Sequence, residues 1–211
     1  EIAQCLVGSE MCIRDSFRTV GGDYYKPTDA DYEANCDEAR QLLADAGYPN
    51  GEGFPVVEYL YNTSDAHKAV AEALQFMWEE ELGVKVTLNN QEWAAFLQTR
   101  KDGDYSIARN GWIADYNDPI SFLDMWMTGG GNNDAQYAND DYDALIKQAK
   151  TTTDNAERMD LLHQAEDKLI GEDNVLAPLY FYTQKYMLAD GIEGMYYCPL
   201  GYFFFGYTHQ A

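Results

Sequence analysis

Charged and aromatic side chains that could bind a small ligand gather in two stretches of the sequence, residues 90–93 and 108–119, and at one position between them. An aspartate there could hold an ammonium group, two arginines could hold a carboxylate, and two tryptophans could line apolar pockets. These residues are Trp93, Arg100, Arg109, Trp112 and Asp115. Such a set suits a zwitterionic ligand of variable length.

The same side chains have a plainer interpretation, in which the tryptophans belong to the core and the arginines pair with nearby acids. The residue types alone do not decide between the two. An enzyme is less well supported, because the sequence has no nucleophile motif, no phosphate-binding glycine loop, and only the scattered histidines His67, His163 and His209. We therefore expect a binding protein rather than an enzyme, with no cofactor and no metal ion.

Helix and strand patterns alternate through the part of the chain that must position these residues. We expect helices at residues 37–46, 67–82 and 92–103, and strands at residues 55–62, 84–88 and 104–112. Asn35 is expected to cap the first helix, and Ser64 or Asp65 the second. This order, with its short connections, predicts an α/β layer. In such sheets ligands bind beyond the carboxyl ends of the strands, where the candidate residues fall.

The remainder of the chain shows a more helical pattern. Pro119 is expected to begin a helix over residues 120–127, because proline is favoured in a first turn, and a loop over residues 128–134 follows. The later elements are helices at about 140–150 and 155–171, an extended stretch at 178–188, and an aromatic strand at 201–207.

The composition excludes several classes of function. The 211 residues carry 36 acidic and 14 basic side chains, a net charge of −22. A chain this acidic repels phosphate backbones and anionic lipid, so we expect no nucleic-acid partner and no peripheral membrane patch. No apolar run approaches the roughly 20 residues that span a bilayer. Cys36 and Cys198 lie in unlike contexts and are not expected to form a bridge.

The first sixteen residues, EIAQCLVGSEMCIRDS, do not resemble the rest of the chain. They lack the basic start and apolar core of a secretory signal. They resemble instead a translated transposase adapter of the kind used in sequencing libraries. We interpret residues 1–16 as an artefact, give Cys5 and Cys12 no chemistry, and expect the natural sequence to start at Phe17 as the interior of a longer protein.

Several motifs, in order, resemble one family. The strings LLADAGYPNGEGFP, YNTSDAHK, NQEWAAFLQTRKDGDYSIARNGWIADYNDP and PLYFYT closely resemble the C-terminal part of the oligopeptide-binding proteins, the extracytoplasmic receptors of ABC peptide importers in solute-binding protein family 5. The likeness covers essentially residues 17–211. It implies a type II periplasmic-binding-protein lobe, with a mixed sheet and flanking helices, at 17–184. A tail at 185–211 would return to an absent first lobe.

The resemblance also implies a role for each candidate residue. Asp115 would pair with the α-ammonium of a peptide, while Arg109, Arg100 and His67 would serve its carboxylate directly or through water. Further roles fall on the side chains of Trp93 and Trp112, which would line pockets, on the main chain of Ile113 and Ala114, which would pair with the peptide, and on Tyr182 as a polar contact. Where family members often carry Cys or Gly this chain has Ile113, with little expected consequence because the main chain is used.

The resemblance implies capture of oligopeptides by a monomeric receptor that then docks on membrane permease subunits. The expected location is extracytoplasmic, in the periplasm or as a cell-surface lipoprotein. The chain would hold about half of the binding cleft. Alternatives are a receptor of the same fold for dipeptides, nickel complexes or sugars, or a sensor or chaperone derived from that fold.

Overall fold

The computed structural model describes residues 29–116, 118–180, 182, 186–198 and 200–211. Residues 1–16, which we interpret as an artefact, lie outside this range. The described chain forms two compact units. The first contains residues 29–110 together with Asp134–Gln136, and the second contains Gly111–Asn133 and Tyr137–Ala211. The candidate residues are divided between them, so each unit is described by itself.

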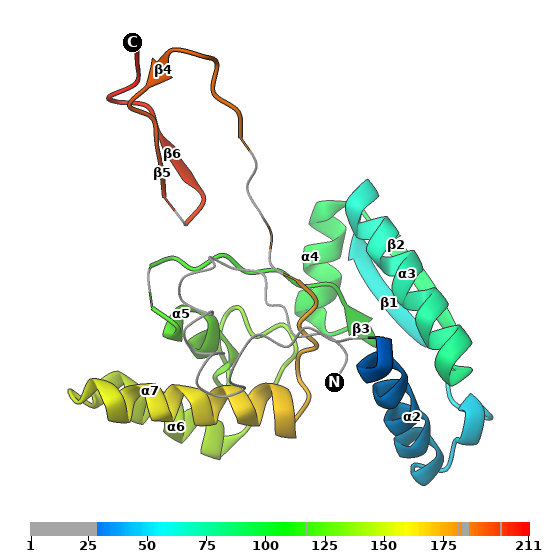
Figure 1. Ribbon diagram of the computed structural model, residues 1–211. Helices are drawn as coiled ribbons and strands as arrows, with labels where there is room; N and C mark the ends of the chain where they lie inside the picture. Colours follow the sequence, from blue (N-terminus) through cyan, green and yellow to red (C-terminus); the bar gives the residue numbers. More distant parts are fainter. Residues whose placement is uncertain (1–28, 117, 181, 183–185, 199) are drawn as a thin grey trace. The chain divides into compact units, whose positions relative to one another are not determined.

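The first unit is an α/β layer (Figure 1). Its elements are α2 (Asp29–Asp45), the short 3-10 helix η1 (Pro49–Gly51), β1 (Val57–Asn62), α3 (Asp65–Leu82), β2 (Val86–Gln91), α4 (Trp93–Asp102) and β3 (Ile107–Ala108). The three strands form a parallel sheet in the order β2-β1-β3. Since the two crossovers run in opposite directions across the sheet, right-handed connections place α3 and α4 on opposite faces of it. The predicted α/β class is confirmed.

Strand β1 is the centre of this layer. Its last four residues, from Tyr59 to Asn62, are all buried, as expected for a strand covered on both faces. β2 runs alongside it in register from Val57 opposite Val86, and therefore ends later than the predicted strand at 84–88. β3 pairs with β1 at only two positions, which makes it far shorter than the predicted strand at 104–112. The chain leaves the sheet soon afterwards and enters the second unit at Gly111.

Most helix ends of the first unit agree with the sequence patterns. Helix α3 ends at Gly83, whose φ of 66° is left-handed, and its amide donates to the carbonyl of Glu79. The prediction that Asn35 caps the first helix is wrong, because α2 already begins at Asp29 and Asn35 lies inside it. Acidic residues favour a helix start, and a single asparagine in a helix interior costs only about 0.5 kcal/mol.

The second unit is built around two helices that follow one another in the chain and pack together, and it ends in short strands. Its elements are α5 (Ile120–Leu123), the 3-10 turn η2 (Asp124–Trp126), α6 (Asp140–Thr151), α7 (Asn155–Glu166) continued by the π-helix η3 (Asp167–Glu172), and strands β4 (Ile192–Glu193), β5 (Tyr196–Cys198), β6 (Tyr202–Phe204) and β7 (His209–Gln210). The predicted helices at about 140–150 and 155–171 and the loop over 128–134 are confirmed, whereas the helix predicted at 120–127 is observed as the short α5 followed by η2. Pro119 takes the N-cap position of α5.

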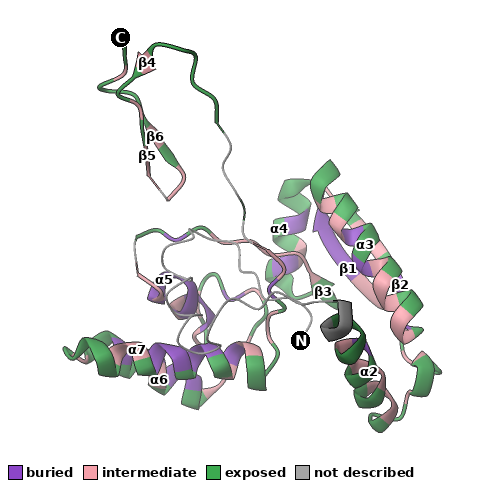
Figure 2. Ribbon diagram, viewed as in Figure 1, coloured by how far each residue is buried: buried purple, intermediate pink, exposed green. Residues whose placement is uncertain are grey.

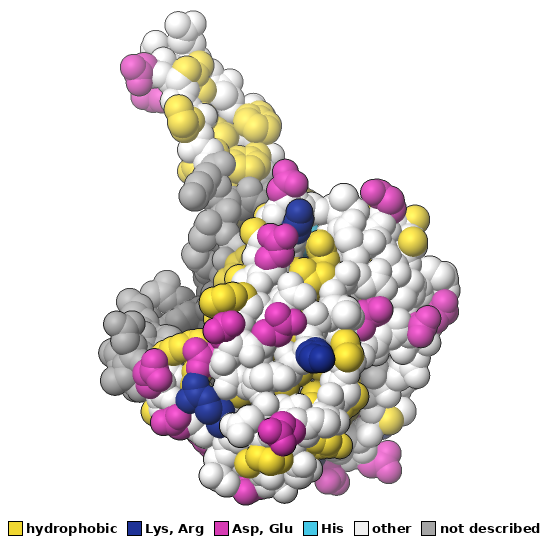
Figure 3. All heavy atoms as spheres, turned by 90° about the vertical axis from the view of Figure 1, so that its right-hand side faces the viewer, with side chains coloured by type: hydrophobic (Ala, Val, Ile, Leu, Met, Phe, Trp, Pro, Cys, Tyr) yellow, Lys and Arg dark blue, Asp and Glu magenta, His cyan; other side chains and the backbone are white. Residues whose placement is uncertain are grey.

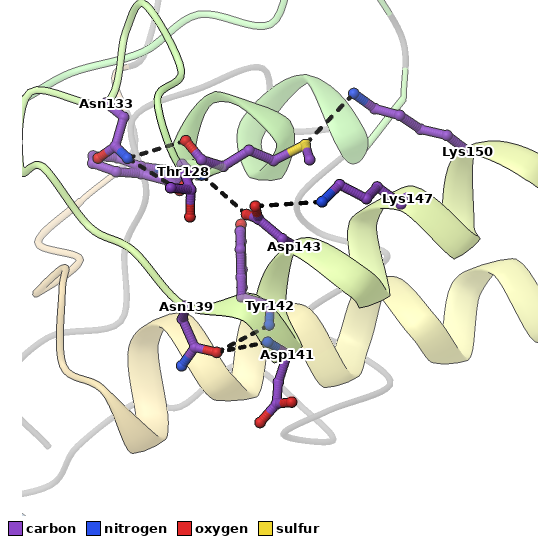
Figure 4. Close-up of polar contacts among 10 residues, drawn as sticks. Thr128, Asn133, Asn139, Asp141, Tyr142, Asp143, Lys147 and Lys150 are labelled. Carbon is purple, nitrogen blue, oxygen red and sulfur yellow. Dashed lines mark hydrogen bonds and ion pairs between the residues drawn. The ribbon is translucent and has the colours of Figure 1, made fainter.

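The core of the second unit lies where α6 and α7 pack on α5 and η2, as the buried faces in Figure 2 show. Tyr142 is fully buried, and its hydroxyl donates to the carbonyl oxygen of Leu123 at 2.6 Å. Asn139 caps α6 by accepting from the amides of Asp141 and Tyr142 (Figure 4). In the preceding loop, the side-chain amide of Asn133 donates to the carbonyl oxygen of Tyr137 at 2.8 Å. These bonds order the loop that leads into α6.

The C-terminal segment forms two antiparallel strand pairs, β4 with β7 and β5 with β6. The predicted strand at 201–207 is reduced to β6, and its partner β5 was not expected. The described residues of the stretch 178–188 belong to neither a helix nor a strand. Within the described part of the chain, no helix combines the length and apolar character that crossing a membrane requires.

Candidate ligand-binding site

The first unit brings three of the predicted residues to one edge of its sheet. Because the strands are parallel, the residues that follow them meet at their carboxyl ends. His67 lies in the first turn of α3, directly after β1, and Trp93 is the first residue of α4, directly after β2. Arg109 follows the last residue of β3.

Arg109 and His67 form a cationic corner at this edge. The amide of Arg109 donates to the carbonyl oxygen of Leu60 at 2.8 Å, and its guanidinium donates to Oδ1 of the buried Asn62 at 3.4 Å. The pKa of His67 is lowered, first by burial and then by the nearby charge of Arg109, while a hydrogen bond with the backbone of Asn62 opposes the shift. At neutral pH the corner therefore carries the arginine charge beside a neutral imidazole.

Arg100 has its polar groups engaged by the protein. Its side chain is buried, forms an ion pair with Asp134, and lies 5.2 Å from the ring centroid of Phe96. One guanidinium nitrogen also donates to the carbonyl oxygen of Arg109 at 3.4 Å. These contacts agree with the plainer interpretation, in which an arginine forms an ion pair with a nearby acid. They also tie the backbone of Arg109 to α4.

Trp93 presents an aromatic surface at the same edge. Its side chain is 53% exposed and stacks on Phe96 with ring centroids 5.8 Å apart. Phe96 itself is fully buried. A fixed inner ring thus supports an exposed outer one, which is an arrangement suited to packing on an apolar group of a ligand.

The second unit contains the other predicted group, residues 112–115. The indole nitrogen of Trp112 donates to the carbonyl oxygen of Ser121 at 2.8 Å, and the amide of Asp115 donates to the hydroxyl of Ser121 at 3.0 Å. Between them Ala114 is buried, whereas Ile113 and Asp115 are exposed. The segment is therefore anchored at both ends, and Asp115 lies at an exposed position.

The main chain in the middle of this segment is available for hydrogen bonds to a ligand. Among the hydrogen bonds of the described residues, none involves the main chain of Ile113 or Ala114. Beyond Asp115, a carboxylate oxygen of Asp118 accepts from the guanidinium of Arg158 at 2.8 Å and from the amide of Ile120 at 2.9 Å. Arg158 also donates to the carbonyl oxygen of Ala149 in α6, so the loop is fixed to the helical core.

Tyr182 lies in the second unit, where its half-exposed ring packs edge-on against Tyr180 at 5.1 Å between centroids. The predicted residues thus form one group in the first unit and one in the second. Sequence reasoning missed the residues that hold them, namely Asn62, Asp134, Ser121 and Arg158. For the most part these lie far along the chain from their partners, and no local motif identifies them. The described residues contain no cluster of His, Cys, Asp or Glu arranged to bind a metal ion.

Comparison with known proteins places these observations in one family. Residues 13–134 match the profile described as bacterial extracellular solute-binding proteins, family 5 Middle. The dipeptide-binding protein DppE of Bacillus subtilis (strain 168) is 38% identical over 187 residues, which are 88% of this chain and 33% of that protein. The chain therefore spans about a third of the length of the curated relatives that it matches.

Two solved structures are similar to this chain in fold. The Haemophilus influenzae OppA complex with the peptide RPPGFSPFR matches with a TM-score of 0.69 and 33% identity, over 76% of this chain and 31% of that one. The Escherichia coli murein tripeptide binding protein MppA matches with a TM-score of 0.71 and 31% identity, over 83% of this chain and 35% of that one.

Proposed function

The chain belongs to the bacterial extracellular solute-binding proteins of family 5, and from this premise we propose that it is part of a receptor that captures oligopeptides outside the cytoplasm for an ABC importer. The importer's permease subunits in the membrane would be its partner. The family is one of solute-binding proteins rather than enzymes. In the proposed receptor, the site residues would bind and orient a ligand that is released chemically unchanged.

The receptor that we propose is longer than this chain, since the relatives are about three times its length. Residues 17–184 would belong to the lobe that holds the peptide, and residues 185–211 would pack on the remainder of the receptor. The hairpin of β5 and β6 supports this division, because it carries aromatic side chains on both faces: Tyr197 packs on Phe203 on one face and Tyr196 on Phe204 on the other. An isolated two-stranded hairpin is only marginally stable in water, and aromatic side chains on both of its faces favour a covering partner.

The exposed position of Asp115 on an anchored backbone segment is the observation that carries the proposal. Asp115 is exposed on a backbone segment that Ser121 anchors, so its carboxylate would be available to a ligand while the main chain that carries it is held in place. The α-ammonium of a peptide is the complementary group, and every peptide has one whatever its side chains. The adjacent main chain of Ile113 and Ala114 would then pair with the peptide main chain as an added strand.

The cationic corner of the first unit would receive the opposite end of the peptide. Arg109 would contact the carboxylate, with His67 beside it as a hydrogen-bonding neighbour. Arg100 would act on the carboxylate chiefly by holding Arg109 in place, since its own guanidinium pairs with Asp134. Trp93 and Trp112 would line side-chain pockets, and Tyr182 would add a polar contact. Terminal charges and main-chain bonds give affinity without reading the peptide sequence.

The proposal is tested by calorimetry on the complete receptor with tri-, tetra- and pentapeptides. Asp115→Ala should weaken binding by about 2–4 kcal/mol, because the ammonium is left buried and unpaired. Asp104→Ala, which removes another exposed acid, is the matched control and should leave affinity unchanged. Equal affinity of wild type and Asp115→Ala, or heat with a sugar and with no peptide, would overturn the assignment. Residues 17–211 alone should bind no peptide measurably.

A dipeptide receptor is the second candidate, and the name of the Bacillus subtilis relative favours including it. The two candidates differ in ligand length rather than in the use of Asp115. Dipeptides therefore belong in the same titrations. Tight binding of dipeptides together with weak binding of tri- to pentapeptides would select this second candidate.

A further inference from the structure

Ser121 receives two hydrogen bonds from the segment that carries Asp115. Its carbonyl oxygen accepts from the indole of Trp112 at 2.8 Å, and its hydroxyl accepts from the amide of Asp115 at 3.0 Å. Its own amide donates to the carbonyl oxygen of Asp118 at 3.1 Å. One residue thus contacts three points of the stretch from Trp112 to Asp118, while its side chain is almost fully buried, with 3% of the residue exposed.

We propose that Ser121 is a positioning residue for ligand recognition: it fixes the direction of the Asp115 carboxylate and the plane of the Trp112 ring together. This inference rests on the proposed function, because it supposes that Asp115 meets a ligand ammonium. Ser121 itself does not contact the ligand in this scheme. It belongs to the first turn of α5, whose four residues are all buried, so its place is set by the core.

The two hydrogen bonds that Ser121 accepts use different groups, so a substitution can remove one of them and keep the other. The bond to Trp112 uses the main-chain carbonyl of Ser121, and every substitution that keeps the helix keeps this acceptor. The bond to Asp115 uses the side-chain hydroxyl, and replacement by alanine removes it. The amide of Asp115 would then lose its partner, and the backbone at Asp115 would be free to rotate the carboxylate away from its set direction.

A second anchor limits how far the loop can move without Ser121. Asp118 is held by Arg158 of α7 and by the amide of Ile120, and Arg158 in turn reaches the carbonyl oxygen of Ala149. The end of the loop therefore stays attached to the core when the Ser121 hydroxyl is lost. We expect a local change of orientation at Asp115 rather than unfolding of the second unit.

The experiment compares two ligands on the complete receptor: a tripeptide with a free amino terminus and the same tripeptide with an acetylated one. Ser121→Ala should weaken binding of the free peptide by about tenfold, the worth of one hydrogen bond, and should change binding of the acetylated peptide less than about twofold. In an Asp115→Ala background, Ser121→Ala should have no further effect on the free peptide. This lack of additivity is the signature of a residue that acts through Asp115.

Two further variants separate positioning from stability. Ser121→Cys keeps the buried volume but offers a much weaker acceptor, and should reproduce most of the loss caused by Ser121→Ala. Tyr142→Phe removes a different buried hydrogen bond from the same core, that to Leu123, and should lower the melting temperature without altering affinity. If Ser121→Ala loses the folded state in a thermal melt, Ser121→Cys takes its place in the comparison.

The outcomes distinguish the inference from its premise. If Asp115→Ala weakens binding and Ser121→Ala does not, the role of Ser121 is wrong and the proposed function stands. Equal weakening of free and acetylated peptides by Ser121→Ala also overturns the role, since it indicates a general loss of structure. If Asp115→Ala leaves the free peptide unaffected, the premise fails and the inference with it.

Discussion

Glu166 is a buried acid in α7 whose protonation should govern how the stability of the second unit changes between about pH 4.5 and pH 8. Burial raises its pKa to about 8, and the neighbouring Asp167 adds to the shift. Because the pKa in the folded state exceeds that in the unfolded state, the stabilisation is fully present at acid pH and is lost as the pH rises toward and through about 8. Glu166→Gln should abolish this loss and stabilise the protein by about 4 kcal/mol at pH 8, as measured by urea unfolding at several pH values.

His163, one turn earlier in α7, is the contrasting variant. Burial lowers its pKa, so its stabilisation is present above the ordinary pKa of histidine and is lost as the pH falls through the lowered value. His163→Gln should therefore flatten the acid side of the stability profile and leave the alkaline side alone. If Glu166→Gln instead altered only the acid side, Glu166 would be ionised in the folded state and the prediction would be wrong.

At the residue scale, the sequence locates the candidate site residues but not the residues that hold them in place. Trp93, Arg109 and His67 are expected at one edge because each follows a strand, and parallel strands end together. The partner of Arg100 was not foreseeable, since Asp134 lies 34 positions further along the chain. Ser121 is only six residues from Asp115, but a serine in an apolar helix start carries no signal of its own.

The turn after α2 should be sensitive to a single methyl group, which is a prediction at the scale of elements. Gly51 has a φ of +73°, and a Cβ there would lie 2.5 Å from the carbonyl oxygen of Gly83 at the end of α3. Gly51→Ala therefore combines backbone strain with a collision, and should lower the free energy of unfolding by about 3 kcal/mol, measured by chemical denaturation.

Gly53, two residues later, provides the control. Its φ is +78°, but a Cβ there would meet no atom within 4 Å. Gly53→Ala should cost about 1 kcal/mol, which is the strain alone. Equal losses for the two variants would show that η1 does not approach the end of α3 closely.

The elements that the sequence predicted well are those with a complete local pattern. Helices α3 and α4 have apolar stripes and end at glycines in the left-handed conformation. The errors occur where tertiary structure decides: only two residues of the predicted third strand pair with β1, and β5 forms a strand by pairing with β6. The local sequence pattern predicts neither the short length of β3 nor the pairing of β5.

At the scale of the whole molecule, the sequence motifs by themselves identify the family, because they occur in the family's order over most of the chain. They do not predict the division into two units. Asp134–Gln136 belongs to the first unit although the residues on both sides belong to the second. Two contacts account for the place of this segment in the first unit. Asp134 forms an ion pair with Arg100, and its carbonyl oxygen accepts a hydrogen bond from the hydroxyl of Tyr105.

The C-terminal hairpin should make the isolated chain self-associate, although the complete receptor is expected to be a monomer. Hydrophobic side chains gather on this segment (Figure 3), and the exposed ones include Tyr196, Tyr202, Phe204, Phe205 and Tyr207. An apolar surface of this kind on a short strand pair favours pairing with a second copy. Sedimentation velocity of the 211-residue chain should show a sedimentation coefficient that rises with concentration.

Changes confined to the hairpin test the origin of this association. Replacing Tyr196 and Phe204 by serine removes one aromatic face and should shift the onset of association to about tenfold higher concentration. Phe76 of α3 is the matched control, because its side chain is 64% exposed but lies outside the hairpin, and Phe76→Ser should leave association unchanged. If the chain stayed monomeric at every concentration, the aromatic faces would be adequately solvated as they are, and the argument that they need a covering partner would fail.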